Sequence, residues 1–209
     1  MVQSDRFDIY REHAQRLLDE GKAVYEDKAI VLPVAAKQVS FEDLLRGTIT
    51  VDTDLFERVV LMKSDGTPAY NFACVVDDAL MKISHVVRGD DHIANTPKQI
   101  VLYEALGFDL PIYVHIPLIV AADRSRLSKR HGATSVSEYR KAGYLSEAFV
   151  NYLSLLGWSP GGNREFMYPD ELIEAFDLAR VKKTAAQFDV RKLDWLNGQH
   201  IKKMAPDVL

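Results

Sequence analysis

Residues 4–23 have the apolar spacing of an amphipathic helix. Ser4 is placed to cap the start of this helix and Gly21 to end it, because serine accepts hydrogen bonds from free helix N–H groups and glycine tolerates a left-handed backbone. Apolar side chains recur every three or four residues and share one face of the helix. They are Phe7, Tyr10, Ala14, Leu17 and Leu18. The pattern predicts a surface helix packed on a core.

Between residues 24 and 62 the helical spacing gives way to short β-rich runs with polar residues between them. Three runs are evident: "AIVLPVA", "GTITVD" and "FERVVLMK". Runs rich in β-branched residues and bounded by polar turns are typical of strands. The segment "SDGTPAY" at residues 64–70 has the composition of a tight turn. This part of the chain is therefore predicted to be mainly β.

Residues 70–120 are predicted to form a strand, a helix and a second strand. "KISHVVRG" predicts a strand, and "PIYVHIPLIV" predicts a second strand that is apolar enough to be buried on both faces. Between them, "NTPKQIVLYEALGF" predicts a helix capped by Asn95 or Thr96, with Pro97 in its first turn and Gly107 past its end. The order predicts a right-handed βαβ unit.

After Thr134 the pattern becomes helical. Four segments have helical length and are separated by Gly, Pro and polar breaks: "SEYRKAGY", "LSEAFVNYLSLLGW", "PDELIEAFDLARV" and "FDVRKLDWLNGQHIKK". The glycine-rich "WSPGGNREF" is predicted to be a turn, because no strand precedes it and no helix begins directly after it in the manner of a phosphate-binding loop. The expected fold is an α/β region followed by an α-helical one.

Composition narrows the class of protein. Of the 209 residues, 47% are hydrophobic and 27% are charged, which is typical of a globular chain. No apolar run approaches the roughly 20 residues that a membrane helix needs, and the polar N-terminus does not resemble a signal peptide. The single cysteine, Cys74, excludes an intrachain disulfide and a cysteine zinc cluster. We therefore expect a cytoplasmic protein with no membrane partner and no zinc site.

The first candidate site lies between the predicted strand and helix of "VVRGDDHIANTP". Ligands of open α/β sheets bind beyond the carboxyl ends of the strands. Arg88 stands at such an end and can form a bidentate pair with a carboxylate. Asp90, Asp91 and His92 add polar groups at the same place, and the helix that begins near Thr96 offers free N–H groups. This arrangement predicts a carboxylate site.

The second candidate site is the loop "DRSRLSKRHGATS" at residues 123–135, which follows the next predicted strand. Its first part holds one acid and five basic side chains: Arg124, Arg126, Lys129, Arg130 and His131. The net charge of the chain is −4, so a polyanion would have to meet a local basic patch of this kind. The two segments together predict a composite site for one carboxylate and one polyphosphate.

Simpler interpretations stay open for each feature. The basic loop could be a solvated surface, and "RGDDH" could be a helix start at which acids are favoured by the dipole. Tyr70 could pack in the core at the exit of a turn, and Cys74 could be a small buried hydrophobe. His92 and His131 carry little weight alone. Only the position of the two segments on successive strand ends makes each support the other.

Three long blocks resemble the catalytic core of bacterial glutamyl-tRNA synthetase, a class I aminoacyl-tRNA synthetase. They are "SDGTPAYNFACVVDDALMKISHVVRGDDHIANTPKQIVLYEALGF", "LSKRHGATSVSEYRKAGYLSEAFVNYLSLLGWSPGGNREF" and "FDVRKLDWLNGQHI". The resemblance implies a leading helix and a shortened acceptor-binding region at residues 1–66. It further implies the second half of a Rossmann catalytic domain at 67–134 and a helical stem-contact domain at 135–209.

The resemblance also implies an activity and its residues. Such an enzyme joins glutamate to tRNA through glutamyl-adenylate, with ATP and Mg²⁺. Tyr70 and Arg88 match positions that contact the amino acid, and Asp91 and His92 match positions beside the adenylate. "RLSKR" matches the mobile loop whose two lysines stabilise the triphosphate in the transition state, which makes Arg126 and Lys129 the expected catalytic and nucleotide-binding cations. The partners implied are tRNA, glutamate and ATP.

The sequence departs from the family pattern in several ways. No "HIGH"-type motif occurs, so we expect the N-terminal half of the Rossmann domain to be lacking, as well as the anticodon-binding domain. Arg126 stands where the loop usually has its first lysine, and arginine lacks the compact geometry of an ammonium group. A half sheet leaves an unpaired strand edge, through which a separate N-terminal half or a second copy could associate. We expect weak activity of the chain alone.

Two other functions stay open. The chain could be a non-catalytic remnant that binds tRNA or a partner chain. It could instead glutamylate a modified tRNA base, although relatives of that kind keep the N-terminal half.

Overall fold

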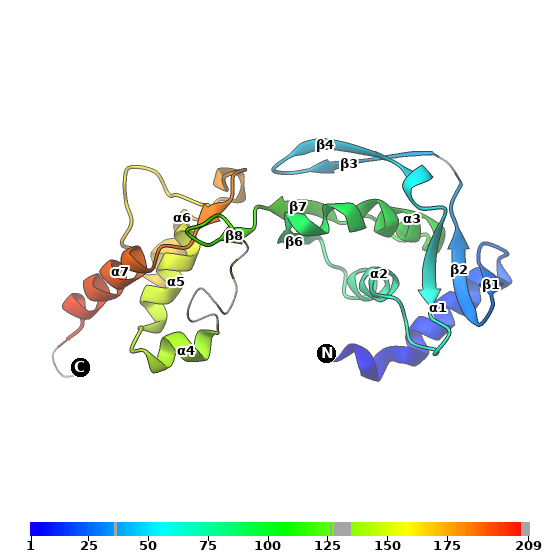
Figure 1. Cartoon of the computed structure of the whole chain (residues 1–209), viewed down its shortest axis with the longest axis horizontal. Helices are drawn as coiled ribbons and strands as arrows, with labels where there is room; N and C mark the ends of the chain where they lie inside the picture. The colour runs from blue at the N-terminus through cyan, green and yellow to red at the C-terminus, as the bar shows by residue number, and fades with distance from the viewer. Residues whose placement is uncertain (36, 126, 128–134, 206–209) are drawn as a thin grey trace. The chain divides into compact units, whose positions relative to one another are not determined.

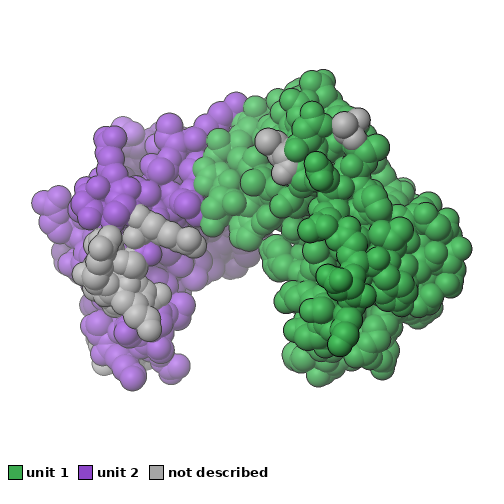
Figure 2. Space-filling view, turned by 45° about the vertical axis from the view of Figure 1, so that its right-hand side comes forward, with its two compact units in different colours: residues 1–115 green, residues 116–209 purple. Residues whose placement is uncertain are grey.

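The computed structural model describes residues 1–35, 37–125, 127 and 135–205. Two compact units, Met1–His115 and Ile116–Leu209, make up the chain, and each is described by itself (Figure 1 and Figure 2). The functional boundaries at residues 66 and 134 stay predictions. Within the described residues, no helix has both the length and the apolarity to cross a membrane.

Unit 1 begins with the predicted amphipathic helix. A 3-10 turn, η1 (Gln3–Arg6), leads into α1 (Phe7–Asp19). Ser4 does not cap this helix, because it lies inside the 3-10 turn and Arg6 occupies the capping position. The end of the helix was predicted correctly: Gly21 has a φ of +69°, and its N–H donates to the carbonyl of Leu18.

The β-rich region forms two antiparallel hairpins of separate sheets. One sheet has the order β1-β2-β5, and the β3–β4 hairpin belongs to the other. The three predicted strands correspond to β2, β4 and β5, whereas β1 and β3 were missed. The element bounds are β1 (Val24–Glu26), β2 (Ala29–Pro33), β3 (Gln38–Asp43), β4 (Gly47–Asp52), η2 (Thr53–Leu55) and β5 (Arg58–Met62).

The helix α2 (Tyr70–Leu80) was not predicted from the sequence. Phe72, Ala73, Val75 and Val76 are buried on it, and they pack in the core of unit 1. The interpretation of Tyr70 as a core residue is wrong, because Tyr70 opens α2 and 53% of it is exposed. At 3.6 residues per turn Tyr70 falls on the opposite face of α2 from these buried residues, which accounts for its exposure.

The strand–helix–strand order predicted for residues 70–120 is present only from residue 85, because residues 70–80 form α2. The second sheet has the order β4-β3-β7-β6, with β3 parallel to β7. The N–H of Ile112 donates to the carbonyl of Ser84, so β6 and β7 begin side by side, as parallel strands do. The elements are β6 (His85–Gly89), η3 (Asp90–Asn95), α3 (Thr96–Leu106) and β7 (Ile112–Ile116).

Two details of this unit differ from the prediction. No side chain caps α3, although Pro97 lies in its first turn and Gly107 ends it in the left-handed conformation, as expected. The second strand is shorter than predicted: β7 ends at Ile116, and Ile119–Val120 forms a separate strand, β8. The two residues between Ile116 and β8 are Pro117 and Leu118, and Pro117 has no N–H to donate to a strand.

Unit 2 contains helices in all four predicted segments and a short parallel pair, β8–β9. Ser135 and Glu138 cap the first of these helices reciprocally. "WSPGGNREF" has no helix or strand, as predicted. The elements are α4 (Val136–Lys141), α5 (Ser146–Leu155), α6 (Pro169–Ala175), η5 (Leu178–Arg180), β9 (Ala186–Gln187) and α7 (Val190–Lys203).

Candidate functional site

Arg88 is the centre of the polar groups at the end of β6. Its Nε donates a hydrogen bond to Nε2 of His115, 3.1 Å away, and its Nη2 donates to the hydroxyl of Thr96 at 2.7 Å. These three residues come from β6, β7 and the start of α3. The strand end that the sequence singled out therefore holds a guanidinium group in a defined place.

His115 is fully buried and is itself held by a carboxylate. Its Nδ1 lies 2.7 Å from Oδ2 of Asp43, and its backbone N–H donates to the same oxygen at 2.9 Å. The other oxygen of Asp43 accepts the backbone N–H groups of Leu45 and Arg46, both at 2.9 Å. Burial lowers the pKa of His115 although the hydrogen bond to Asp43 opposes this, so the imidazole is neutral at neutral pH.

Asp90 forms an ion pair with Arg46, which lies in the turn between β3 and β4. Oδ2 of Asp90 lies 2.7 Å from Nη2 of Arg46, and both side chains are partly exposed. Arg46 also donates through Nε to the backbone carbonyl of His115 at 3.3 Å. This ion pair connects the turn after β3 to the start of η3. The carboxylate of Asp90, at the predicted carboxylate site, is therefore bound by a protein side chain.

One face of α2 lies near Arg88. Tyr70, Cys74 and Asp78 follow one another at helical spacing, and the charge of Arg88 acts on all three. Burial raises the pKa of each of these groups, and Arg88 opposes the rise. Cys74 is only partly buried, so it is not the core hydrophobe that its sequence context suggested. The i, i+4, i+8 spacing could have revealed this face if the helix had been recognised.

The structure brings Tyr70 and His92 together as well. Their ring centroids are 6.1 Å apart, and Nδ1 of His92 lies 3.1 Å from Nδ2 of Asn95. Asp91 precedes His92 in η3. The predicted residues Tyr70, Arg88, Asp91 and His92 thus occupy one end of the second sheet and the helices beside it.

The two predicted loop cations, Arg126 and Lys129, lie outside the described residues. The start of the loop is ordered by Asp123, whose Oδ1 accepts hydrogen bonds from the backbone N–H and hydroxyl of Ser125 at 2.9 and 2.6 Å. Whether the loop faces Arg88 stays a prediction.

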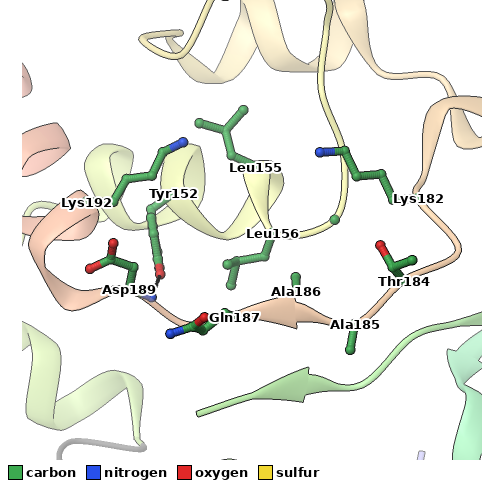
Figure 3. A pocket seen from close by; sticks show the side chains of 11 residues that line it. Tyr152, Leu155, Leu156, Lys182, Thr184, Ala185, Ala186, Gln187, Asp189 and Lys192 are labelled. Carbon is green, nitrogen blue, oxygen red and sulfur yellow. Dashed lines mark hydrogen bonds between the residues drawn. The ribbon is translucent and has the colours of Figure 1, made fainter. Parts of the chain in front are cut away.

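Unit 2 has a pocket of about 240 Å³ between the end of α5, β9 and the start of α7 (Figure 3). Lys182 and Lys192 lie on opposite sides of it in Figure 3. Nζ of Lys192 is paired with Glu165 at 2.6 Å, and the hydroxyl of Tyr152 accepts the backbone N–H of Asp189 at 2.7 Å. Two ammonium groups, those of Lys182 and Lys192, therefore line the pocket, and that of Lys192 is already paired with a carboxylate.

Residues 26–195 match the profile of a family described as tRNA synthetases class I (E and Q), catalytic domain. The chain belongs to this family. It is 46% identical to the glutamate–tRNA ligase of Aquifex aeolicus, over 99% of this chain and 54% of that protein. It is 42% identical to glutamate–tRNA ligase 2 of Caldicellulosiruptor saccharolyticus, over 97% of this chain and 51% of the relative.

Solved structures of class I synthetases agree with this assignment. A glutamate tRNA ligase from Elizabethkingia meningosepticum, solved in complex with its amino acid, superimposes with a TM-score of 0.89 at 29% identity. The superposition covers 99% of this chain and 55% of the Elizabethkingia meningosepticum chain. The glutamate-tRNA synthetase of Elizabethkingia anophelis gives a TM-score of 0.79 at 35% identity, over 94% of this chain and 43% of the other. The fold is therefore that of a class I synthetase catalytic region.

The chain spans about half the length of these relatives. The alignment with the Aquifex ligase extends over 253 positions, more than the 209 residues of this chain, so the ligase has residues within the matched region that this chain lacks. Synthetases of this family are ATP-dependent ligases. The described part of this chain contains no cluster of three or more His, Cys, Asp or Glu side chains that could hold a metal ion.

Asp43, His115 and Thr96 were not recognised as a set from the sequence. Asp43 lies in a strand that was missed, and 72 positions separate it from His115. His115 lies within the apolar run "IYVHI". A histidine in a run that is predicted to be buried was the one indication in the sequence that this residue has a polar partner.

Proposed function

We propose that this chain carries the amino-acid site of a glutamate–tRNA ligase, the function that its relatives' names state. The observation that supports this most directly is Arg88, a partly buried guanidinium at a strand end whose charge acts on Tyr70, and the ring of Tyr70 in turn lies near that of His92. In this proposal Arg88 binds a carboxylate of glutamate, and Tyr70 contacts the same substrate. Asp91 and His92 lie beside the adenylate.

The proposed reaction begins when the α-carboxylate of glutamate attacks the α-phosphorus of ATP. A bond forms between the carboxylate oxygen and phosphorus, and pyrophosphate leaves. Glutamyl-adenylate then passes its acyl group to tRNA and releases AMP. Negative charge develops on the phosphates, so the chemistry depends on positioned cations. Arg126 and Lys129 are proposed to supply them.

Mg²⁺ is expected to arrive with the nucleotide. It usually binds through one or two carboxylates and substrate phosphates. The phosphates of ATP are therefore expected to supply several of the ligands of this ion. The helical region from α4 to α7 is proposed to contact the tRNA stem, and the protein is proposed to act in the cytoplasm.

A second candidate is a module that binds glutamate, tRNA or a partner chain without catalysing the ligation. The observation in its favour is that the Aquifex ligase has residues within the matched region that this chain lacks. Glutamate-dependent exchange of pyrophosphate into ATP distinguishes the two, because only the enzyme forms the adenylate.

The decisive experiment is calorimetric titration of glutamate into the wild-type chain, Arg88→Ala and Arg58→Ala. Truncating one partner of a buried charge pair costs about 2–5 kcal/mol, so Arg88→Ala should weaken binding by more than tenfold. Arg58, which is 60% exposed in the other sheet, gives a matched control that should bind as the wild type does. Equal affinity of the wild type and Arg88→Ala would refute the assignment of Arg88.

A further inference from the structure

The guanidinium of Arg88 is occupied by protein along one of its two forked edges. Nε and Nη2 form the side edge of a guanidinium, and Nη1 and Nη2 form its end edge. Nε donates to His115 at 3.1 Å and Nη2 to Thr96 at 2.7 Å, so these two bonds use the side edge. A guanidinium has five N–H donors, and the described residues take two of them through these bonds. The end edge remains for a ligand.

The bond from Arg88 requires one particular form of His115. Nε2 accepts a hydrogen bond only while it carries no hydrogen. A carboxylate only accepts, so Asp43 holds the hydrogen on Nδ1 and leaves the lone pair on Nε2. In the other tautomer, or in the imidazolium, an N–H of His115 would face the N–H of Arg88. Asp43 thereby selects the form that can hold Arg88.

Thr96 and Tyr113 complete the support of the guanidinium. The hydroxyl of Thr96 is fully buried, accepts from Arg88 and lies 3.2 Å from Nε2 of His115. Cζ of Arg88 lies 5.6 Å from the centroid of the Tyr113 ring, and that ring is stacked with His115 at an angle of 9°. The side edge and one face of Arg88 are therefore both in contact with buried residues.

We infer that Asp43, His115 and Thr96 are positioning residues that fix Arg88 by its side edge, so that its end edge receives the substrate carboxylate. This inference rests on the proposed glutamate site. Two parallel N–H donors match two carboxylate oxygens, whereas a carboxamide would place an NH₂ group against one of them. The rigid support of Arg88 thus also determines how strongly the site prefers glutamate to glutamine.

The support is tested without substrate by ¹⁵N NMR of the whole chain. The expected result is a His115 imidazole with hydrogen on Nδ1, and an Arg88 Nε–H that exchanges slowly with water. His115→Phe should make that exchange fast, while His115→Gln should keep it slow because its amide oxygen can accept in place of Nε2. His13→Phe, a partly buried histidine of α1, is the matched control. Hydrogen on Nε2 in the wild type, or equally slow exchange in His115→Phe, overturns the inference.

The role toward substrate is tested by titrating glutamate and glutamine into the same proteins. His115→Phe and Thr96→Val should weaken glutamate binding about tenfold, the scale of a hydrogen bond to a charged group. They should change glutamine binding less, so the preference falls. His115→Gln should recover part of the loss, and His13→Phe should bind as the wild type.

The outcomes separate this inference from the proposed function. If the wild type binds no glutamate, the proposed function and the substrate half of the inference fail, while NMR still decides whether His115 supports Arg88. If the wild type binds glutamate and His115→Phe keeps both affinity and preference, the proposed function stands and the positioning role is refuted.

Discussion

The hydroxyl of Tyr10 donates a hydrogen bond to Oδ2 of Asp77, 2.8 Å away, and joins α1 to α2 in the core of unit 1. Asp77 is 3% exposed and also accepts from Nε of Arg6 at 2.8 Å and from Nε2 of Gln3 at 2.9 Å. The carboxylate of Asp77 keeps all three hydrogen bonds only while η1 and α1 stay packed against α2. The contact therefore holds the N-terminal segment on the helix that presents Tyr70.

Tyr10→Phe should lower the free energy of unfolding by about 1.5–3 kcal/mol, the range for hydrogen bonds to charged groups. The ring stays and only the donor to Asp77 is removed. Urea unfolding at neutral pH, followed by circular dichroism, measures the change. Tyr25→Phe is the control, because Tyr25 is 63% exposed and should cost less than about 0.5 kcal/mol. Equal costs for the two variants would contradict the prediction.

Alkaline pH should destabilise the same contact. Burial, and then the hydrogen bond to Asp77, raises the pKa of Tyr10 to about 12, above the ordinary value of 10. The folded state thus favours the protonated phenol, so the stabilisation is complete below pH 10 and is lost as the pH rises toward 12. Unfolding curves from pH 8 to 11.5 should show a smaller loss for Tyr10→Phe than for the wild type. Parallel losses would exclude Tyr10 as the cause.

In unit 2, Asn151→Ala should lower stability by about 1–3 kcal/mol, because it leaves buried polar groups without partners. Asn151 is fully buried and donates to the carbonyl of Glu165 at 2.9 Å. Its Oδ1 accepts the N–H of Met167 at 3.0 Å and lies 3.1 Å from Nε2 of His200. Thermal unfolding of this variant is compared with that of Gln15→Ala, an exposed amide on α1. A loss no greater than that of Gln15→Ala would refute the role of Asn151.

Lys129→Ala should lower the rate of glutamate-dependent ATP–pyrophosphate exchange more than it lowers ATP affinity, if the lysine acts on the transition state. Losing one donor of this kind commonly costs about 10²–10³ in rate. Arg126→Lys should keep or raise the rate, since it returns the residue type of the family loop. Exchange is measured both without and with the added N-terminal half of a close relative. Unchanged exchange in Lys129→Ala, in a sample that is active, would show that the loop is only a solvated surface.

Self-association through the edge of the second sheet should depend on Val87. β6 ends the strand order of this sheet, and Val87 is 51% exposed on it. Exposed apolar edge strands pair with other chains, and a lysine on the edge opposes this. Light scattering after gel filtration should give a smaller mean mass for Val87→Lys than for the wild type at high concentration. A monomeric wild type at every concentration would exclude the edge as an association site.

The sequence predicted most of the elements but not the partners of the site. Strong helical spacing located α1, α3 and α7, and β-branched runs located β2, β5 and β6. The apolar "NFACVV" of α2 was ambiguous because a short apolar run fits a strand or a helix equally well. Arg88 was identified because it lies at the end of a recognisable strand. Asp43 and His115, which support it, were not identified, because their pairing depends on the arrangement of β3 and β7 rather than on any local pattern.

The hydrogen bond between Asp43 and His115 can form only late in the synthesis of this part of the chain. β3 is made first and can pair with β4 at once, but its partner on the other side, β7, follows later in the chain. The two residues are 72 positions apart, and translation at about 5–20 residues per second separates them by roughly 4–14 s. Until then Asp43 is hydrated and one edge of β3 is open. Arg88 emerges from the ribosome before the histidine that holds it, so the proposed amino-acid site forms only after β7 has been synthesised.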